Sequence, residues 1–100
     1  MTYRIKLLPE ASFDVREIME WYDEEKPGLG DRFFESLKSG LNYIKKYPLH
    51  CQVRYRDVRN ILVEKFPYQI HYRVEEPDRS VIVFAVTHTS RNPRVWKNKR

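Results

Sequence analysis

The spacing of apolar residues predicts a strand followed by a helix at the start of the chain. From Tyr3 to Leu8, apolar and basic side chains alternate, which is the period-two pattern of a half-buried strand. From Pro9 to near Lys26, apolar residues instead recur every three or four positions, as on an amphipathic helix. This apolar face consists of Val15, Ile18, Met19 and Tyr22. Acidic residues occupy most of the other positions, so we expect the helix to have an acidic outer face.

A second helix is expected after a short break. Pro27-Gly28 interrupts the first pattern, and the next helix should begin at Gly30-Asp31 or just before. Its core-facing positions are Phe33, Leu37, Leu41 and Ile44. Tyr47-Pro48 should end it, after two lysines that complement the helix dipole. Because the connection is short, the two helices should pack as an antiparallel hairpin.

The second half of the chain is typical of strands joined by turns. We expect strands at 53–58, 61–66 and 69–74 and a last strand from Val81, with Asn60 as the first turn residue and Glu76-Pro77-Asp78 as the last turn. The last strand is nearly all apolar, so it should be the central strand, buried on both faces. The prediction is an α+β fold: an N-terminal strand, a helical hairpin and a four-strand antiparallel meander, with the helices on one face of an antiparallel sheet. Residues 1–100 should form one domain.

Composition narrows the class of protein. The 33% charged and 14% aromatic residues indicate an ordered, water-soluble domain. No apolar run approaches the roughly 20 residues of a membrane span, and no signal-peptide core is present, so we expect a cytoplasmic protein with no membrane partner. Cys51, the single cysteine, can form no internal disulfide and has no neighbours with metal-ligand spacing. We therefore expect no metal site and no cofactor.

Charge is distributed unevenly along the chain. Residues 1–50 carry 8 Lys and Arg against 9 Asp and Glu, net −1, whereas residues 51–100 carry 11 against 5, net +6. This asymmetry favours an anionic partner, either nucleic acid or an acidic protein segment, although solvated surface charge explains it equally well. Arg54 and Arg56 occupy alternate positions of a predicted strand, which suits an ordinary wet face or an anion-binding stripe.

Polar and aromatic side chains follow the last predicted strand. His88 could act as an acid or base, or it could be a packing residue at a strand end. Arg91 has no obvious core role and is either a functional or a solvated residue. Trp96 could pack back onto the sheet or contact a partner. If the chain has a site, this end of the sheet is where we expect it.

Several short motifs follow one another along almost the whole chain. They are Pro9-Glu10-Ala11, Trp21-Tyr22, Gly30-Asp31-Arg32-Phe33, Tyr47-Pro48, Tyr68-Gln69-Ile70-His71-Tyr72-Arg73-Val74 and Phe84-Ala85-Val86-Thr87-His88, followed by Arg91 and Trp96. In order and spacing they resemble the RelE/ParE toxin superfamily of bacterial type II toxin–antitoxin modules. The resemblance implies a small cytoplasmic toxin of a plasmid-stabilisation type of module, neutralised by a cognate antitoxin.

The superfamily contains two activities, and the residues favour one of them. In the branch that cleaves mRNA on the ribosome, cations on the third strand and an Arg after the Tyr of the fourth surround the scissile phosphate. Here the third strand reads Ile61-Leu62-Val63-Glu64-Lys65, and Gln69 follows Tyr68. Only Arg73, His88 and Arg91 remain as candidate catalytic residues, with His88 as acid or base and the arginines as phosphate clamps.

The long helical hairpin and the His88-x-x-Arg91-x-Pro93 pattern instead resemble the ParE-like branch, whose members are associated with poisoning DNA gyrase. Our hypothesis is therefore a non-enzymatic ParE-like toxin, and the alternative is a RelE-like mRNA endonuclease. In either case we expect a disordered antitoxin segment to wrap the toxin and to pair its carboxylates with Arg54, Arg56, Arg73 or Arg91, with Trp96 as a further contact.

Overall fold

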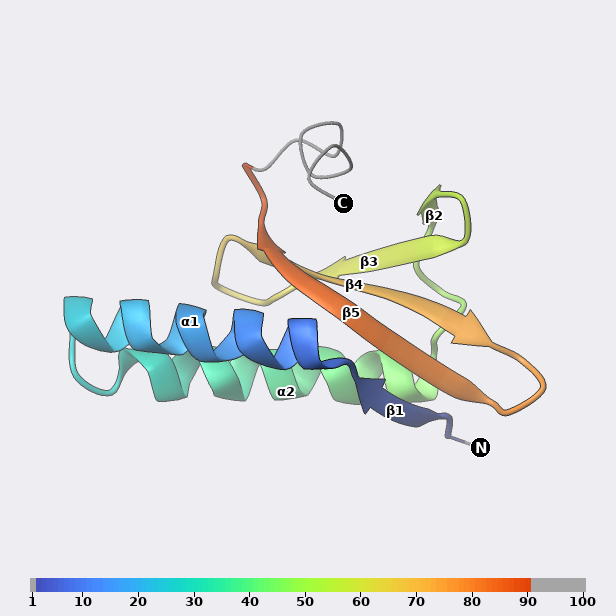
Figure 1. The fold of residues 1–100 in the computed structure, drawn as a ribbon, viewed down its shortest axis with the longest axis horizontal. Helices are drawn as coiled ribbons and strands as arrows, with labels where there is room; N and C mark the ends of the chain where they lie inside the picture. The colour runs from blue at the N-terminus through green and yellow to red at the C-terminus, as the bar shows by residue number, and fades with distance from the viewer. Residues whose placement is uncertain (1, 91–100) are drawn as a thin grey trace.

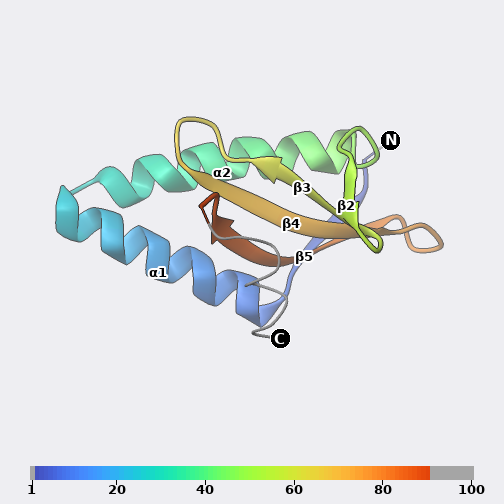
Figure 2. The ribbon, with the colours of Figure 1, turned by 90° about the horizontal axis from the view of Figure 1, so that it is seen from above.

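The computed structural model describes residues 2–90, and the structural statements below concern that part of the chain. The elements in order are β1 (Arg4–Leu7), α1 (Pro9–Glu25), α2 (Leu29–Lys46), β2 (Val53–Tyr55), β3 (Val58–Leu62), β4 (Tyr68–Glu75) and β5 (Ser80–His88). The two helices lie side by side beneath the sheet (Figure 1), and Figure 2 looks down onto the sheet from above. The predicted α+β class and both helix boundaries are confirmed.

The sheet is mixed, with strand order β1-β5-β4-β3-β2. The last four strands form the predicted antiparallel meander. The expectation of an antiparallel sheet throughout is wrong, because β1 pairs parallel with β5, from Arg4 opposite Ser80 to Leu7 opposite Val83. Two helices rather than a hairpin turn separate β1 from the meander, so nothing forces an antiparallel neighbour. β5 is an interior strand, as its apolar sequence requires, but β4 holds the central position.

β5 contains an irregularity that changes which face its side chains occupy. His71 of β4 lies opposite Ala85, but the next residue, Tyr72, lies opposite Val83, so Phe84 is an extra residue. Val81, Val83 and Val86 consequently face the helices. Phe84 and Ala85 both join a smaller cluster with Val58 on the opposite face of the sheet.

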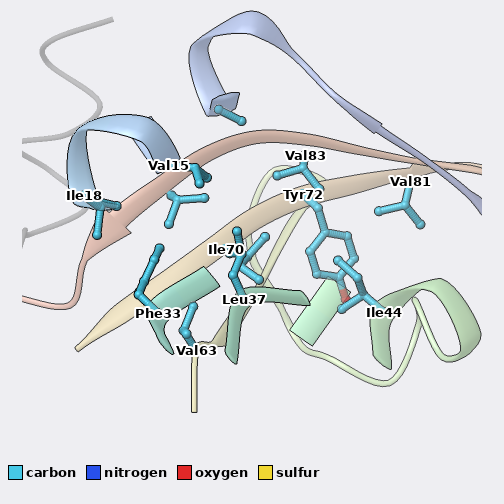
Figure 3. Close-up of a cluster of buried hydrophobic side chains, with 12 residues drawn as sticks. Val15, Ile18, Phe33, Leu37, Ile44, Val63, Ile70, Tyr72, Val81 and Val83 are labelled. Atoms are coloured by element: carbon cyan, nitrogen blue, oxygen red, sulfur yellow. The ribbon is translucent and has the colours of Figure 1, made fainter. Parts of the chain in front are cut away.

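The main core lies between the two helices and the sheet (Figure 3). Phe33, Leu37 and Ile44 of α2 are at most 1% exposed and meet Ile70 and Tyr72 of β4. Tyr72 is fully buried, and its hydroxyl donates to the carbonyl of Pro48 at 2.8 Å. This bond satisfies the one polar atom that Tyr72 carries into the core, and it ties β4 to the end of α2.

The boundaries of the first two meander strands differ from the prediction. The turn lies at Arg56-Asp57, with Arg56 at φ 49°, and Asn60 sits inside β3 instead of at the turn. Arg54 donates to the Asn60 amide oxygen at 3.2 Å, and the Asn60 amide nitrogen donates to the Gln69 oxygen at 3.0 Å. This side-chain ladder across three strands outweighs the preference of asparagine for turns. Residues 63–66, predicted as strand, form the next turn.

The turn between the helices depends on close approach of their backbones. Gly28 adopts φ 90°, a left-handed conformation that glycine reaches without strain. Asp23 then caps α2 by accepting the backbone N–H of Gly30 at 2.8 Å. A Cβ on Gly30 would lie 2.6 Å from the Met19 carbonyl oxygen, so a side chain has no room there.

We expect Gly30→Ala to destabilise the fold by about 1–3 kcal/mol, because the methyl group must push α1 and α2 apart. Chemical denaturation monitored by circular dichroism measures the change. Ser39→Ala, at an exposed position of α2, is the matched control and should stay within about 0.5 kcal/mol of the parent. An unchanged midpoint for Gly30→Ala would contradict the close packing of the hairpin.

We expect Tyr72→Phe to cost about 1–2 kcal/mol, because the Pro48 carbonyl loses its buried donor. Burial raises the pKa of Tyr72 above its ordinary value of 10.0, so the folded state holds the phenolic proton more tightly than the unfolded chain. The contribution of this proton to the stability of the fold is fully present below about pH 10 and is lost as the pH rises further. Denaturation from pH 8 to 11 should show a shallower alkaline loss in Tyr72→Phe than in Tyr43→Phe, an exposed control.

Candidate functional site

A groove of about 780 Å³ lies between α1 and the second half of β5. β1 pairs only with Ser80–Val83, so the Phe84–His88 half of β5 faces α1 with no strand between them. The groove therefore runs along a strand edge that the sheet leaves open, with α1 as its second wall.

The α1 wall is acidic with an apolar strip. Ile18 and Trp21 supply the apolar strip, and the Trp21 side chain is 53% exposed. The carboxylates that line this wall are Glu10, Asp14, Glu17, Glu20 and Glu24. The sequence predicted an acidic face on this helix, and the structure shows that this face borders a groove.

The sheet side of the groove carries two of the candidate catalytic residues, Arg73 and His88. Arg73 of β4 is partly exposed, and its Nε lies 3.5 Å from a carboxylate oxygen of Glu75. His88 packs edge-on against Tyr68, with 5.1 Å between ring centroids. The His88 Nδ1 accepts the backbone N–H of Ser90 at 3.0 Å, so a neutral ring in this arrangement holds its proton on Nε2.

One hydrogen bond joins the two walls. The Asp14 Oδ2 accepts the backbone N–H of Val86 at 3.0 Å. Val86 lies two residues after Phe84, the extra residue in β5, and on this edge no strand of the described chain supplies an acceptor for its N–H. A side chain of α1 thus takes the place of a neighbouring strand and fixes the width of the groove.

The structure brings together only some of the residues that the sequence singled out. Arg73 and His88 both line the groove. Arg54 is on β2, at the far edge of the sheet, where it donates to Asn60, and Arg56 is an exposed turn residue. Arg91 and Trp96 lie outside the described residues.

Sequence reasoning missed the acidic wall as part of a site. The three- and four-residue spacing of its carboxylates was visible, but what they face depends on the packing of α1 against β5. Among residues 2–90, no group of three or more His, Cys, Asp or Glu side chains is arranged to hold a metal ion. Neither helix in this part of the chain is long and apolar enough to cross a membrane.

Comparison with known proteins identifies the fold. The family model described as the ParE toxin of type II toxin–antitoxin systems, parDE, matches residues 5–93. The chromosomal ParDE toxin–antitoxin system of P. aeruginosa contains a chain 14% identical, with a TM-score of 0.74, covering 87% of this chain and 96% of that one. A mutant of E. coli RelE in the free state is 21% identical, with a TM-score of 0.71 and coverage of 97% and 93%.

An archaeal relative has the same fold. The RelE–RelB complex of Pyrococcus horikoshii contains a chain 13% identical, with a TM-score of 0.62, covering 92% of this chain and all of that one. No curated protein matches the sequence. At these identities the solved structures share the fold, and they come from both ParE and RelE systems.

We expect Asp14→Ala to destabilise the protein by about 1–3 kcal/mol, because the Val86 N–H loses its acceptor at the edge of β5. Glu17→Ala, on the same wall but exposed, should change stability by no more than about 0.5 kcal/mol. Denaturant titrations of the two variants give the comparison. Faster hydrogen exchange at Val86 in Asp14→Ala alone would confirm the cause, and equal stabilities would contradict it.

Proposed function

Because the chain belongs to the ParE toxin family of type II toxin–antitoxin systems, we propose that it arrests bacterial growth by binding a large target, DNA gyrase, with no chemistry of its own. Residues 1–100 would act as a single cytoplasmic domain that a cognate antitoxin neutralises. Toxin–antitoxin complexes among the similar structures, such as the RelBE complex of E. coli, support the antitoxin partner.

The charges in the groove favour a toxin that binds its target over one that cleaves RNA. Arg73 and His88, the two described residues that could act on a phosphate, share the groove with five carboxylates of α1. Arg73 also has Glu75 within 3.5 Å. Stabilising a phosphorane needs concentrated positive charge, and carboxylates at this range oppose it.

The third strand supports the same choice. Asn60 and Gln69 are joined by their amide groups, and Leu62 is 65% exposed beside them. Glu64 and Lys65 lie in the turn after β3 and not on the strand. Arg59, the cation of β3, donates to the backbone carbonyls of Leu49 and Cys51, so the rest of this strand presents an amide and apolar side chains where the nuclease branch is expected to present cations.

One observation favours the alternative, a RelE-like mRNA endonuclease acting on the ribosome. Arg73 and His88 come from different strands, yet they line the same groove. In this arrangement His88 could donate its Nε2 proton to the leaving 5′-oxygen and Arg73 could clamp the phosphate, while another group would have to take the proton of the attacking 2′-hydroxyl. Arg91, the third candidate catalytic residue, would have to complete this set.

Inducing the protein in growing bacteria should arrest growth, and the purified protein should inhibit supercoiling by gyrase or accumulate cleavage complexes. Arg73→Ala/His88→Ala should remain toxic, because binding needs no proton transfer. Growth curves and gel assays of supercoiling measure both effects. Ser39→Ala, at an exposed position of α2 that does not line the groove, is the control for expression and folding.

Primer extension on translated messages distinguishes the mRNA endonuclease from the proposed gyrase-binding toxin. Cuts in the ribosomal A site that disappear in Arg73→Ala/His88→Ala, together with normal gyrase activity, would replace the proposal by the endonuclease. Intact messages during growth arrest would exclude the endonuclease as the function of this protein.

A further inference from the structure

A second surface, made of exposed apolar side chains, lies where α2 ends and the chain enters β2. Tyr43, Tyr47, Leu49 and Val53 are 40%, 46%, 51% and 46% exposed, and none of them lines the groove beside α1. Apolar side chains that are exposed singly are normal on a soluble protein, whereas a group of them marks an interaction site. We call these four residues, together with His50, the α2-end surface.

The three rings of the α2-end surface contact one another. Tyr43 and Tyr47 are one helical turn apart on α2, with 5.3 Å between ring centroids. His50 stacks on Tyr47 at 4.9 Å with an angle of 13° between the ring planes, and the Tyr43 hydroxyl lies 3.1 Å from the His50 Nδ1. The rings therefore hold each other in fixed orientations while both tyrosines stay open to solvent.

The backbone that carries Leu49 is anchored to the sheet. The buried Tyr72 hydroxyl donates to the carbonyl of Pro48 at 2.8 Å, and the Arg59 Nη1 donates to the carbonyls of Leu49 and Cys51. These bonds from β3 and β4 fix the loop, yet they leave the Leu49 side chain in water. Folding gains little from such a side chain, but a partner that binds it pays less to order the loop.

Positive charge surrounds the α2-end surface. Lys46 is one turn from Tyr43 on α2, and Arg59 lies opposite Val53 in the pairing of β2 with β3. Neither cation forms a salt bridge within residues 2–90. Residues 36–56 contain no Asp or Glu and carry five cations: Lys38, Lys45, Lys46, Arg54 and Arg56. The complementary surface has an apolar centre flanked by carboxylates.

The aliphatic side chains favour a protein partner over a nucleic acid. Bases could stack on Tyr47, but Leu49 and Val53 offer nothing to a phosphate backbone. Exposed tyrosines beside aliphatic side chains, with cations at the rim, have the composition of a protein-binding surface. A surface that is fixed in advance also suits a folded partner, which cannot adapt its own shape to a mobile loop.

We propose that the α2-end surface is where this toxin binds its large target, and that the target presents an apolar centre flanked by Asp and Glu side chains. The existence of that target, DNA gyrase, rests on the proposed function, whereas the place and the charge of the contact rest on the structure. The apolar side chains supply most of the affinity. Lys46 and Arg59 speed association and select an acidic partner, because exposed ion pairs are individually weak.

Removing the apolar side chains tests the place of the contact. Tyr47→Ser/Leu49→Ser should bind immobilised, purified gyrase at least about tenfold more weakly than the parent, mainly through faster dissociation, and should inhibit supercoiling correspondingly less. Phe13→Ser/Leu62→Ser removes two side chains that are 55% and 65% exposed elsewhere on the molecule, so it should bind as the parent does. Circular dichroism and denaturant titration check that both variants are folded.

One position can report the charge of the partner. Because Leu49 is exposed, both Leu49→Asp and Leu49→Lys should fold, and both lose the apolar contact. An acidic partner should bind Leu49→Asp at least about tenfold more weakly than Leu49→Lys. A single-stranded oligothymidylate in the same assay should bind Tyr47→Ser/Leu49→Ser and the parent equally. Weaker binding of the oligothymidylate to this variant would assign the surface to nucleic acid and overturn the inference.

The inference and the proposed function fail on different results. Equal inhibition of gyrase by the parent and by Tyr47→Ser/Leu49→Ser would overturn the inference and leave the proposed function. Equal binding of gyrase by Leu49→Asp and Leu49→Lys would overturn the acidic character of the partner. Growth arrest with unaffected gyrase would overturn the proposed function alone, and the inference would then fail if Tyr47→Ser/Leu49→Ser arrested growth as strongly as the parent.

Discussion

The arrangement of the molecule depends on how the two edges of β5 are satisfied. β4 pairs with β5 along its whole length, but β1 has only four residues and covers the first half of the other edge. In the second half, α1 takes over, and Asp14 supplies the acceptor that a strand would have provided. This substitution holds α1 at a distance from the sheet that leaves a groove between them. A longer β1 would have closed the sheet at this edge and removed the site.

Local and overall charge have opposite signs in this protein. The chain carries a formal charge of +5, yet the groove beside α1 has a wall of carboxylates. Net charge governs the approach of a distant partner through the summed field, whereas the side chains in contact govern which partner stays. The basic residues of the second half are spread over the β2–β3 edge, the turns and the groove, so they form no single anion-binding stripe in the described structure.

Much of the fold could be predicted from the sequence because its signals are local. The helices follow from apolar spacing and from the Pro27-Gly28 break, and β5 follows from its continuous apolar run. Asn60 was misplaced because its partners, Arg54 and Gln69, become neighbours only when three strands pair. Parallel pairing of β1 was missed for a similar reason, since no turn connects it to β5. Arg73 and His88, both selected from the sequence, line the groove, but the acidic wall borders it only because α1 packs against β5, where Asp14 meets Val86 from 72 residues away in the sequence.

The extra residue in β5 bears on how this chain can be compared with its relatives. Side chains on a strand alternate between faces, and Phe84 reverses that alternation, so that Val86 and His88 lie on the same side as Val81 and Val83. A relative without this residue would direct the side chain at the corresponding sequence position to the other face of its sheet. Alignment columns beyond Phe84 therefore do not guarantee equivalent positions in space. Among structures only 13–21% identical, superposition of the strands, and not the order of letters, has to decide which residue of a relative corresponds to His88.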